Sequence, residues 1–122
     1  MADDLQSWFK SLPKKLQQEL AGTMLNIADG LADDIRTAAE EHSLSGETAE
    51  SVRVTPGRDA TENFVEAGGP ATTENGYDRA LAQEFGTQKM PAQPFFYSTY
   101  YARRQDIRQA IERAVTDVLS KT

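Results

Sequence analysis

The residues that most often carry out catalysis are scarce in this sequence. His42 is the only histidine and there is no cysteine, so a two-histidine metal site and all thiolate chemistry are excluded within one chain. A nucleophile–histidine pair would have to join His42 to Ser43 or Ser45, and residues so close along the chain rarely reach the geometry that proton transfer needs. We therefore interpret His42 as a solvated side chain near the C-terminus of a helix, where the helix dipole favours its protonated form.

Acidic doublets and one glycine doublet are the remaining candidates for chemistry. Neighbouring side chains on a helix point about 100° apart, so adjacent acids do not by themselves form a catalytic dyad or a magnesium site. Gly68–Gly69 is followed by Pro70 and lacks the Lys-Ser/Thr pair of a phosphate loop. We expect a solvated acidic surface, no enzyme activity, no cofactor and no metal. The acidic doublets are Asp3–Asp4, Asp33–Asp34 and Glu40–Glu41.

Composition narrows the class of protein further. At 122 residues the chain should form one domain, and its hydrophobic content of 39% is low enough that assembly with partners would add to its stability. The net charge of −6 argues against a protein that binds nucleic acid by neutralising phosphates. The start, MADDLQSWFKSL, has no apolar run, and no segment reaches the 18 or so apolar residues of a membrane span. We expect a soluble protein made in the cytoplasm.

Apolar spacing predicts a long first helix over residues 12–41, preceded by a flexible leader over residues 1–11. In the leader, Trp8 and Phe9 form a small apolar cluster that either packs back on the domain or reaches a neighbour. Gly22 and Gly30 interrupt the helix at a cost of roughly 1 kcal/mol each relative to alanine. They are either tolerated there, or they allow another helix to approach closely. The apolar positions of the helix recur every three or four residues; they are Leu12, Leu16, Leu20, Met24, Ile27, Leu31, Ile35 and Ala38.

A β-hairpin is predicted next, because the spacing of the apolar residues changes from every three or four residues, as in a helix, to every second residue, as in a strand. Ser51–Thr55 alternates in polarity, a turn-rich segment follows, and Asn63–Gly69 reads as the return strand. A two-stranded hairpin is marginally stable alone, so it must pack on a helix or pair through its edge with another copy. A short helix over residues 77–85 and a long C-terminal helix complete an α+β fold, with residues 12–122 forming a single domain.

The start of the last helix carries more aromatic residues than a core requires. Phe95 is expected to anchor the helix against the domain, and Phe96 and Tyr100 fall on the face expected to be buried. The surplus aromatic residues beside arginines have the composition of a protein–protein interface. Stacking on nucleobases is the alternative, which the negative net charge disfavours. The residues predicted at an interface are Tyr97, Tyr101, Arg103 and Arg104, together with Trp8 and Phe9 of the leader.

Three segments of the chain together resemble one known family. LSGETAESVRV lies before the predicted hairpin, YDRALAQEFGT covers the short helix, and MPAQPFF leads into the last helix. In this order they resemble the tail-completion or neck protein family of long-tailed bacteriophages, the gene-product-ten-like family of minor tail proteins. The residues that carry the motif are Gly46, Ser51, Glu84, Phe85, Gly86, Thr87, Pro94 and Phe95.

The resemblance implies a structural, non-enzymatic role in the virion, completing the tail or neck at the head–tail junction. The implied partners are other copies of the chain in a ring, for which six copies is one candidate size, and neighbouring head-completion and tail proteins. We expect no membrane and no sequence-specific nucleic acid, although DNA would pass through the assembly. The expected location is the tail or neck of the virion, and the host cytoplasm during assembly. The alternatives are a tail terminator ring subunit and a non-virion protein-binding module, such as an assembly chaperone or regulator.

Overall fold

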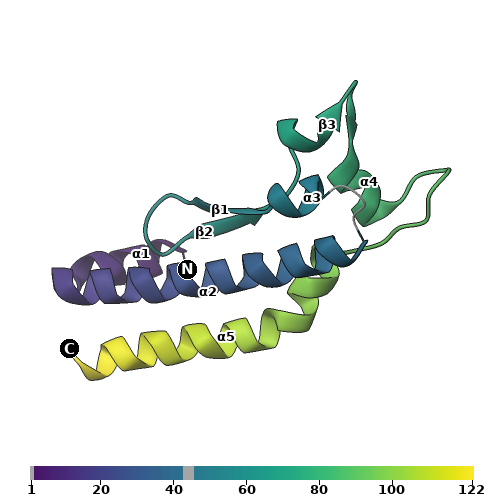
Figure 1. Ribbon diagram of the computed structural model, residues 1–122. Coiled ribbons are helices and arrows are strands. Elements are labelled where there is room, and N and C mark those ends of the chain that lie inside the picture. The colour runs from purple at the N-terminus through teal and green to yellow at the C-terminus, as the bar shows by residue number, and fades with distance from the viewer. Residues whose placement is uncertain (1, 43–45) are drawn as a thin grey trace.

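A computed structural model describes residues 2–42 and 46–122 of the chain, and it has the α+β fold expected from the sequence. The long helix α2, Lys14–His42, lies in the middle. A hairpin formed by β1, Arg53–Pro56, and β2, Asn63–Glu66, packs on one side of α2, and the last helix α5, Tyr97–Ser120, packs antiparallel to α2 on the other (Figure 1). The predicted hairpin and both long helices are therefore confirmed.

The apolar core is divided into two clusters, one toward each end of α2. The first lies where α2 meets the hairpin and the start of α5, and consists of Ala32, Ile35, Ala39, Ala49, Val52, Ala80 and Phe95. The second lies where α2 meets the end of α5, and consists of Phe9, Leu12, Leu16, Leu20 and Val118. Between the two clusters α5 is only half-buried, and Val118 is its one buried residue. The expected core face of α5 is thus wrong for Tyr100, whose side chain is exposed.

The segment that we expected to be a flexible leader instead contains helix α1, Ala2–Ser11. Phe9 is buried in the second core cluster, and Trp8 packs beside that cluster. The side-chain amide of Gln17 donates hydrogen bonds to the carbonyl groups of Phe9, Lys10 and Leu12, at 3.1 Å each, and so satisfies the end of α1. Of the two outcomes expected for the apolar pair, packing back on the domain is the one observed.

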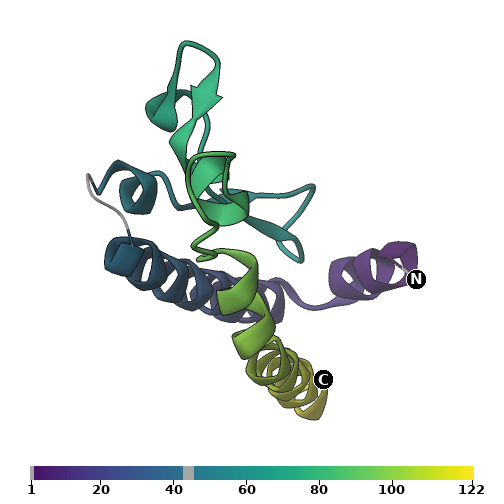
Figure 2. The ribbon, with the colours of Figure 1, turned by 90° about the vertical axis from the view of Figure 1, so that its right-hand side faces the viewer.

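Short elements lie on both sides of the β1–β2 hairpin along the chain. Before β1 lies α3, Glu47–Glu50, and after β2 come the 3₁₀ helix η1, Pro70–Thr72, and α4, Arg79–Phe85. Between η1 and α4 a second hairpin is formed by β3, Thr73–Glu74, and β4, Tyr77–Asp78, in a segment that the sequence had suggested was partly loop. This β3–β4 hairpin projects from the body, away from α5, in both views (Figure 1 and Figure 2).

Asp78 ties the base of the β3–β4 hairpin together. Its carboxylate accepts hydrogen bonds from the hydroxyl of Thr72 at 2.6 Å, from the N–H of Gly69 at 3.1 Å and from the N–H of Ala80 at 2.9 Å. The last of these caps α4. Burial opposes ionisation, but the hydrogen bonds from Thr72 and the backbone outweigh it, so the pKa of Asp78 lies below its ordinary value.

We expect Asp78 to make the stability of the protein sensitive to acid. Because its folded pKa is depressed, its contribution is complete above the unfolded pKa of about 3.9 and is lost as the pH falls through the folded value. Asp78→Asn should therefore lower the free energy of unfolding at pH 7 by about 1 kcal/mol, because a neutral amide replaces the charged acceptor of the hydrogen bonds from Thr72 and Gly69. The gap between the two proteins should narrow below about pH 4. Chemical denaturation of both proteins from pH 7 to pH 2.5 measures the gap, and a gap that stayed constant would contradict this role.

Gly22 and Gly30 test the two explanations given for glycine in a long helix. A Cβ atom built on either residue meets nothing within 4 Å, so no helix of the same chain approaches them. We expect Gly22→Ala and Gly30→Ala each to raise the free energy of unfolding of the monomer by about 0.5–1 kcal/mol. Thermal and chemical denaturation of dilute protein measures this. Should either variant also weaken self-association, a helix of another copy approaches that glycine.

Candidate interaction surface

The acidic residues of the described part do not gather into a metal-binding cluster. Over residues 2–42 and 46–122 no group of three or more potential metal ligands is placed to hold an ion. Asp33 pairs with Arg36 on its own helix at 2.6 Å, while Asp34 pairs with Arg103 of α5 at 3.0 Å, so this doublet points in two directions. The possible pair of His42 with Ser43 or Ser45 falls on side chains outside the described part. Within that part no helix is long and apolar enough to span a membrane.

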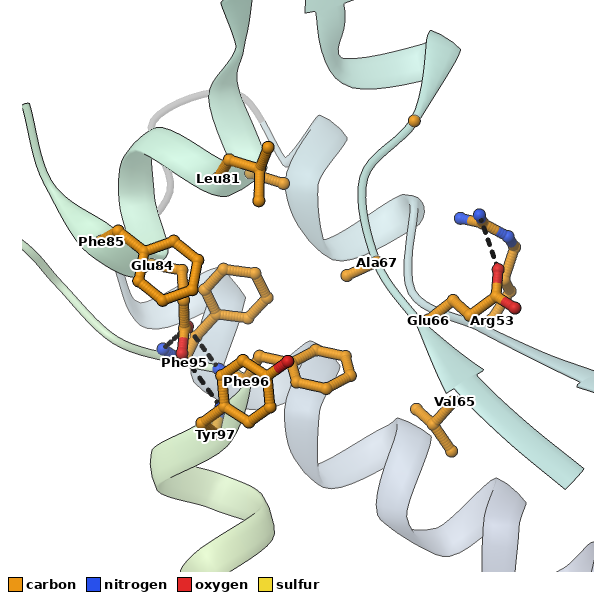
Figure 3. A pocket seen from close by; sticks show the side chains of 12 residues that line it. Arg53, Val65, Glu66, Ala67, Leu81, Glu84, Phe85, Phe95, Phe96 and Tyr97 are labelled. Carbon is orange, nitrogen blue, oxygen red and sulfur yellow. Dashed lines mark hydrogen bonds and ion pairs between the residues drawn. The ribbon is translucent and has the colours of Figure 1, made fainter.

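Glu84 of the EFGT motif holds the start of α5. Its side chain is buried, and one carboxylate oxygen accepts hydrogen bonds from the N–H groups of Phe95 at 2.9 Å and Phe96 at 2.8 Å. The other oxygen accepts one from the N–H of Tyr97 at 3.1 Å. A helix start leaves unpaired N–H groups and a partial positive charge, so a carboxylate is well suited to satisfy it. The motif therefore couples α4 to α5 through one side chain (Figure 3).

The connection between α4 and α5 depends on Gly86 and Phe95. Gly86 has a φ of 79°, and a Cβ atom there would lie 2.7 Å from the backbone nitrogen of Ala92, so only glycine fits. The N–H of Gln93 donates to the carbonyl of Gln83 at 2.8 Å, which returns the chain alongside α4. Phe95 then enters the first core cluster and is 1% exposed. The anchor role predicted for Phe95 agrees with this geometry.

The other motif residues support the surrounding backbone. Gly46 has a φ of 78° at the start of α3, a conformation that glycine adopts readily. The buried hydroxyl of Ser51 donates to the carbonyl of Thr48 at 2.6 Å and accepts from the N–H of Gly68 at 2.9 Å, so it joins α3 to the end of the β1–β2 hairpin. Thr87 forms a tight turn with Met90, and Pro94 is exposed just before the anchor.

A set of large apolar side chains remains uncovered beside this connection. Phe85 is 64% exposed and Tyr101 is 60% exposed, and the ring of Tyr97 lies between them, 6.4 Å from Phe85 and 6.5 Å from Tyr101 between ring centroids. Leu81, one turn before Phe85 on α4, is also exposed. The guanidinium of Arg104 lies 5.4 Å above the centre of the Tyr101 ring. We call Leu81, Phe85, Tyr97 and Tyr101 the aromatic patch.

The aromatic patch borders a groove of about 410 Å³ between α4, the end of β2 and the start of α5. On one wall are Leu81 and Phe85, and on the other are Val65 and Ala67 of the β2 segment, with Phe96 and Tyr97 below (Figure 3). The ion pair of Arg53 and Glu66, with atoms 3.1 Å apart, closes the far end. Such a groove, apolar with a few charged groups at its rim, is suited to a side chain or short segment of another protein.

The structure separates the predicted interface residues into two groups. Tyr97, Tyr101 and Arg104 are exposed and lie together at the aromatic patch, as an interface requires. Arg103 faces α2 instead, where it pairs with Asp34. Phe9 is 8% exposed inside the second core cluster, so its assignment to an interface is corrected: packing on Leu12, Leu16 and Val118 uses its ring within the chain. Trp8 is half-buried against the same cluster.

Leu81 and Phe85 are the members of the aromatic patch whose exposure the sequence did not reveal. Their spacing of four residues predicted the short helix, but the buried side of α4 is formed by Ala80, Gln83 and Glu84. Ala80, Gln83 and Glu84, which are small or polar, were the one sign in the sequence that the other side of α4 could be the buried one. Neither protein-family models, nor curated proteins, nor solved structures give a match to this chain. What the surface can do must therefore be inferred from its own geometry.

Proposed function

We propose that this protein is a structural subunit of a long-tailed bacteriophage or prophage, which assembles with copies of itself to complete the tail or neck at the head–tail junction. The observation that carries the proposal is the uncovered aromatic patch, a set of exposed apolar side chains that lie together on α4 and the start of α5. Contiguous exposed apolar side chains bounded by arginine are characteristic of protein–protein interfaces. The motif that resembles the phage family is the one that builds this surface.

The build of the domain also favours a role in assembly. The aromatic patch stands on α4 and the start of α5, which the Glu84 carboxylate joins, while Asp78 caps the other end of α4. Rings held on such a support lose little conformational freedom when they bind. The half-buried α5 and the low apolar content indicate that further apolar area is available for burial between subunits.

The test is the mass of the protein in solution by light scattering over a range of concentrations, followed by electron microscopy of any large species. A ring with a central hole would support the proposal. The presence of the chain in finished particles would separate a virion subunit from an assembly chaperone or regulator. A chain that forms a small oligomer and never enters particles would overturn the virion role and favour the binding-module alternative.

Tyr101 should contribute to assembly but not to folding, because most of its side chain is exposed. We expect Tyr101→Ala to weaken self-association by about tenfold or more, as for an aromatic interface residue worth about 1.4 kcal/mol or more. The free energy of unfolding of the monomer should change by about 0.5 kcal/mol or less. The matched control is Leu119→Ala, an exposed apolar residue on the same helix but far from the aromatic patch. Equal weakening by both variants would count against a specific role for Tyr101.

A further inference from the structure

The face of α5 that continues from the aromatic patch carries positive charge without a carboxylate partner in the described part of the chain. Tyr97, Tyr101, Arg104 and Arg108 recur at spacings of three and four residues, so they share one face of α5. Arg104 stacks on Tyr101, and neither Arg104 nor Arg108 has a carboxylate partner among residues 2–42 and 46–122. An occupant that complements this surface must combine an acidic group with an aromatic or apolar one.

The tip of the β3–β4 hairpin has that combination. Its turn residues, Asn75 and Gly76, have φ values of 53° and 78°, which is the pattern of a tight type I′ turn. The pair next to the turn is Glu74 opposite Tyr77, so one acid and one aromatic ring stand side by side at the tip. Both side chains are exposed, and Glu74 has no ion pair within the described part of the chain.

The β3–β4 hairpin does not bind in the groove of its own chain. In both ribbon views it projects from the body on the side opposite to α5 (Figure 1 and Figure 2). The groove is lined instead by Phe95, Phe96 and Tyr97, where α5 begins. The hydrogen bonds of Asp78 with Thr72, Gly69 and Ala80 hold its base in this direction. A short strand pair held outward in this way is preorganised to enter another molecule.

We propose that the groove receives the β3–β4 hairpin of a second copy of this chain, with Glu74 beside Arg104 and Tyr77 against the aromatic patch. This inference rests on the proposed function, because it specifies how the subunits of that assembly join. The hairpin and the groove are different surfaces of the chain, so the contact is head-to-tail. Head-to-tail contacts generate rings when the rotation between neighbours closes, and filaments when it does not.

The experiment exchanges the charges across the proposed contact. Glu74→Arg and Arg104→Glu are made singly and together in the full chain, and self-association is measured by light scattering and analytical ultracentrifugation. We expect each single variant to weaken self-association by tenfold or more, because it places like charges together. The double variant should return to within about threefold of the original protein. The matched control is Arg113→Glu, an exposed arginine at the other end of α5, which should leave self-association unchanged.

Mixing the two single variants gives an independent reading. In an equimolar mixture, the arginine at position 74 of one variant can meet the glutamate at position 104 of the other. The Glu74 and Arg104 that remain in the two variants can meet in the same way, so contacts between unlike variants join opposite charges. The mixture should therefore assemble more strongly than either variant alone. Tyr77→Ala tests the apolar part of the contact and should weaken self-association by a similar factor. Circular dichroism and thermal melting of each variant, all changed at exposed positions, establish that the monomers are folded.

The outcomes separate this inference from the proposed function. Recovery by the double variant would support the hairpin-in-groove contact. Assembly of both single variants like the original protein, or loss without recovery, would overturn the contact and leave the proposed ring in place. A protein that stays monomeric at every concentration would overturn self-docking, and the virion role would then be judged by whether the chain is found in finished particles.

Discussion

Phe95→Ala is expected to lower the free energy of unfolding by about 3–5 kcal/mol, more than any other substitution proposed for this protein. The ring is 1% exposed and belongs to the first core cluster, where residues from α2, α3 and α4 surround it. Removing it leaves a cavity at the point where these elements meet the start of α5. A loss of this size is a large fraction of the stability of a small domain, so part of the population would unfold at ordinary temperature.

The measurement is chemical denaturation of dilute protein, followed by fluorescence of the single tryptophan and by circular dichroism. The matched control is Phe85→Ala, which removes the same side chain from a position that is 64% exposed. That variant should change the free energy of unfolding by about 1 kcal/mol or less. A loss in Phe95→Ala no larger than in Phe85→Ala would show that Phe95 does not anchor the helix.

Glu84→Ala is expected to cost about 3 kcal/mol, because three N–H groups at the start of α5 lose their acceptor at once. A buried N–H group left without a partner costs about 1–3 kcal/mol, and here the N–H of Phe95 is buried while those of Phe96 and Tyr97 are partly buried. Glu84→Gln keeps the size of the side chain and one oxygen acceptor. Its loss should be about half as large, since one oxygen alone accepts two of the three bonds.

Amide hydrogen exchange locates the effect. In Glu84→Ala the N–H groups of Phe95, Phe96 and Tyr97 should exchange faster than those in the middle of α5, because the first turn opens locally. Glu112→Ala, which removes an exposed glutamate from the same helix, is the matched control and should change the free energy of unfolding by about 0.5 kcal/mol or less. Unchanged exchange at residues 95–97 would mean that water replaces the carboxylate without cost, and would remove Glu84 as the cap.

The two long helices and the first hairpin were predictable because their signals are local. The spacing of apolar residues over 12–41 identifies α2, and the alternation near Val52 and Val54 identifies the β1–β2 hairpin. Phe95 is buried, as expected of an anchor for the last helix. The second hairpin has strands of two residues, too short to leave a periodic signal.

The structure of the first residues was not predictable from local pattern. Residues 2–11, ADDLQSWFKS, are polar enough to suggest a flexible leader, yet they form α1 because Phe9 packs beside Val118, near the opposite end of the chain. The amide of Gln17 then satisfies the end of α1. Neither contact leaves a trace in the spacing of residues 1–11, since both partners lie outside it.

By itself the sequence determined the two long helices, the first hairpin and the short helix before the last one, and that few residues suited to catalysis are present. Only the tertiary structure decided which side of each short element faces solvent. In α4 the apolar pair Leu81 and Phe85 stays outside, because Glu84 on the other side is held by the start of α5. Burying the apolar stripe of a seven-residue helix contributes too little free energy to set the orientation of the helix. Contacts with neighbouring elements set the orientation of α4 instead, and they leave the aromatic patch exposed.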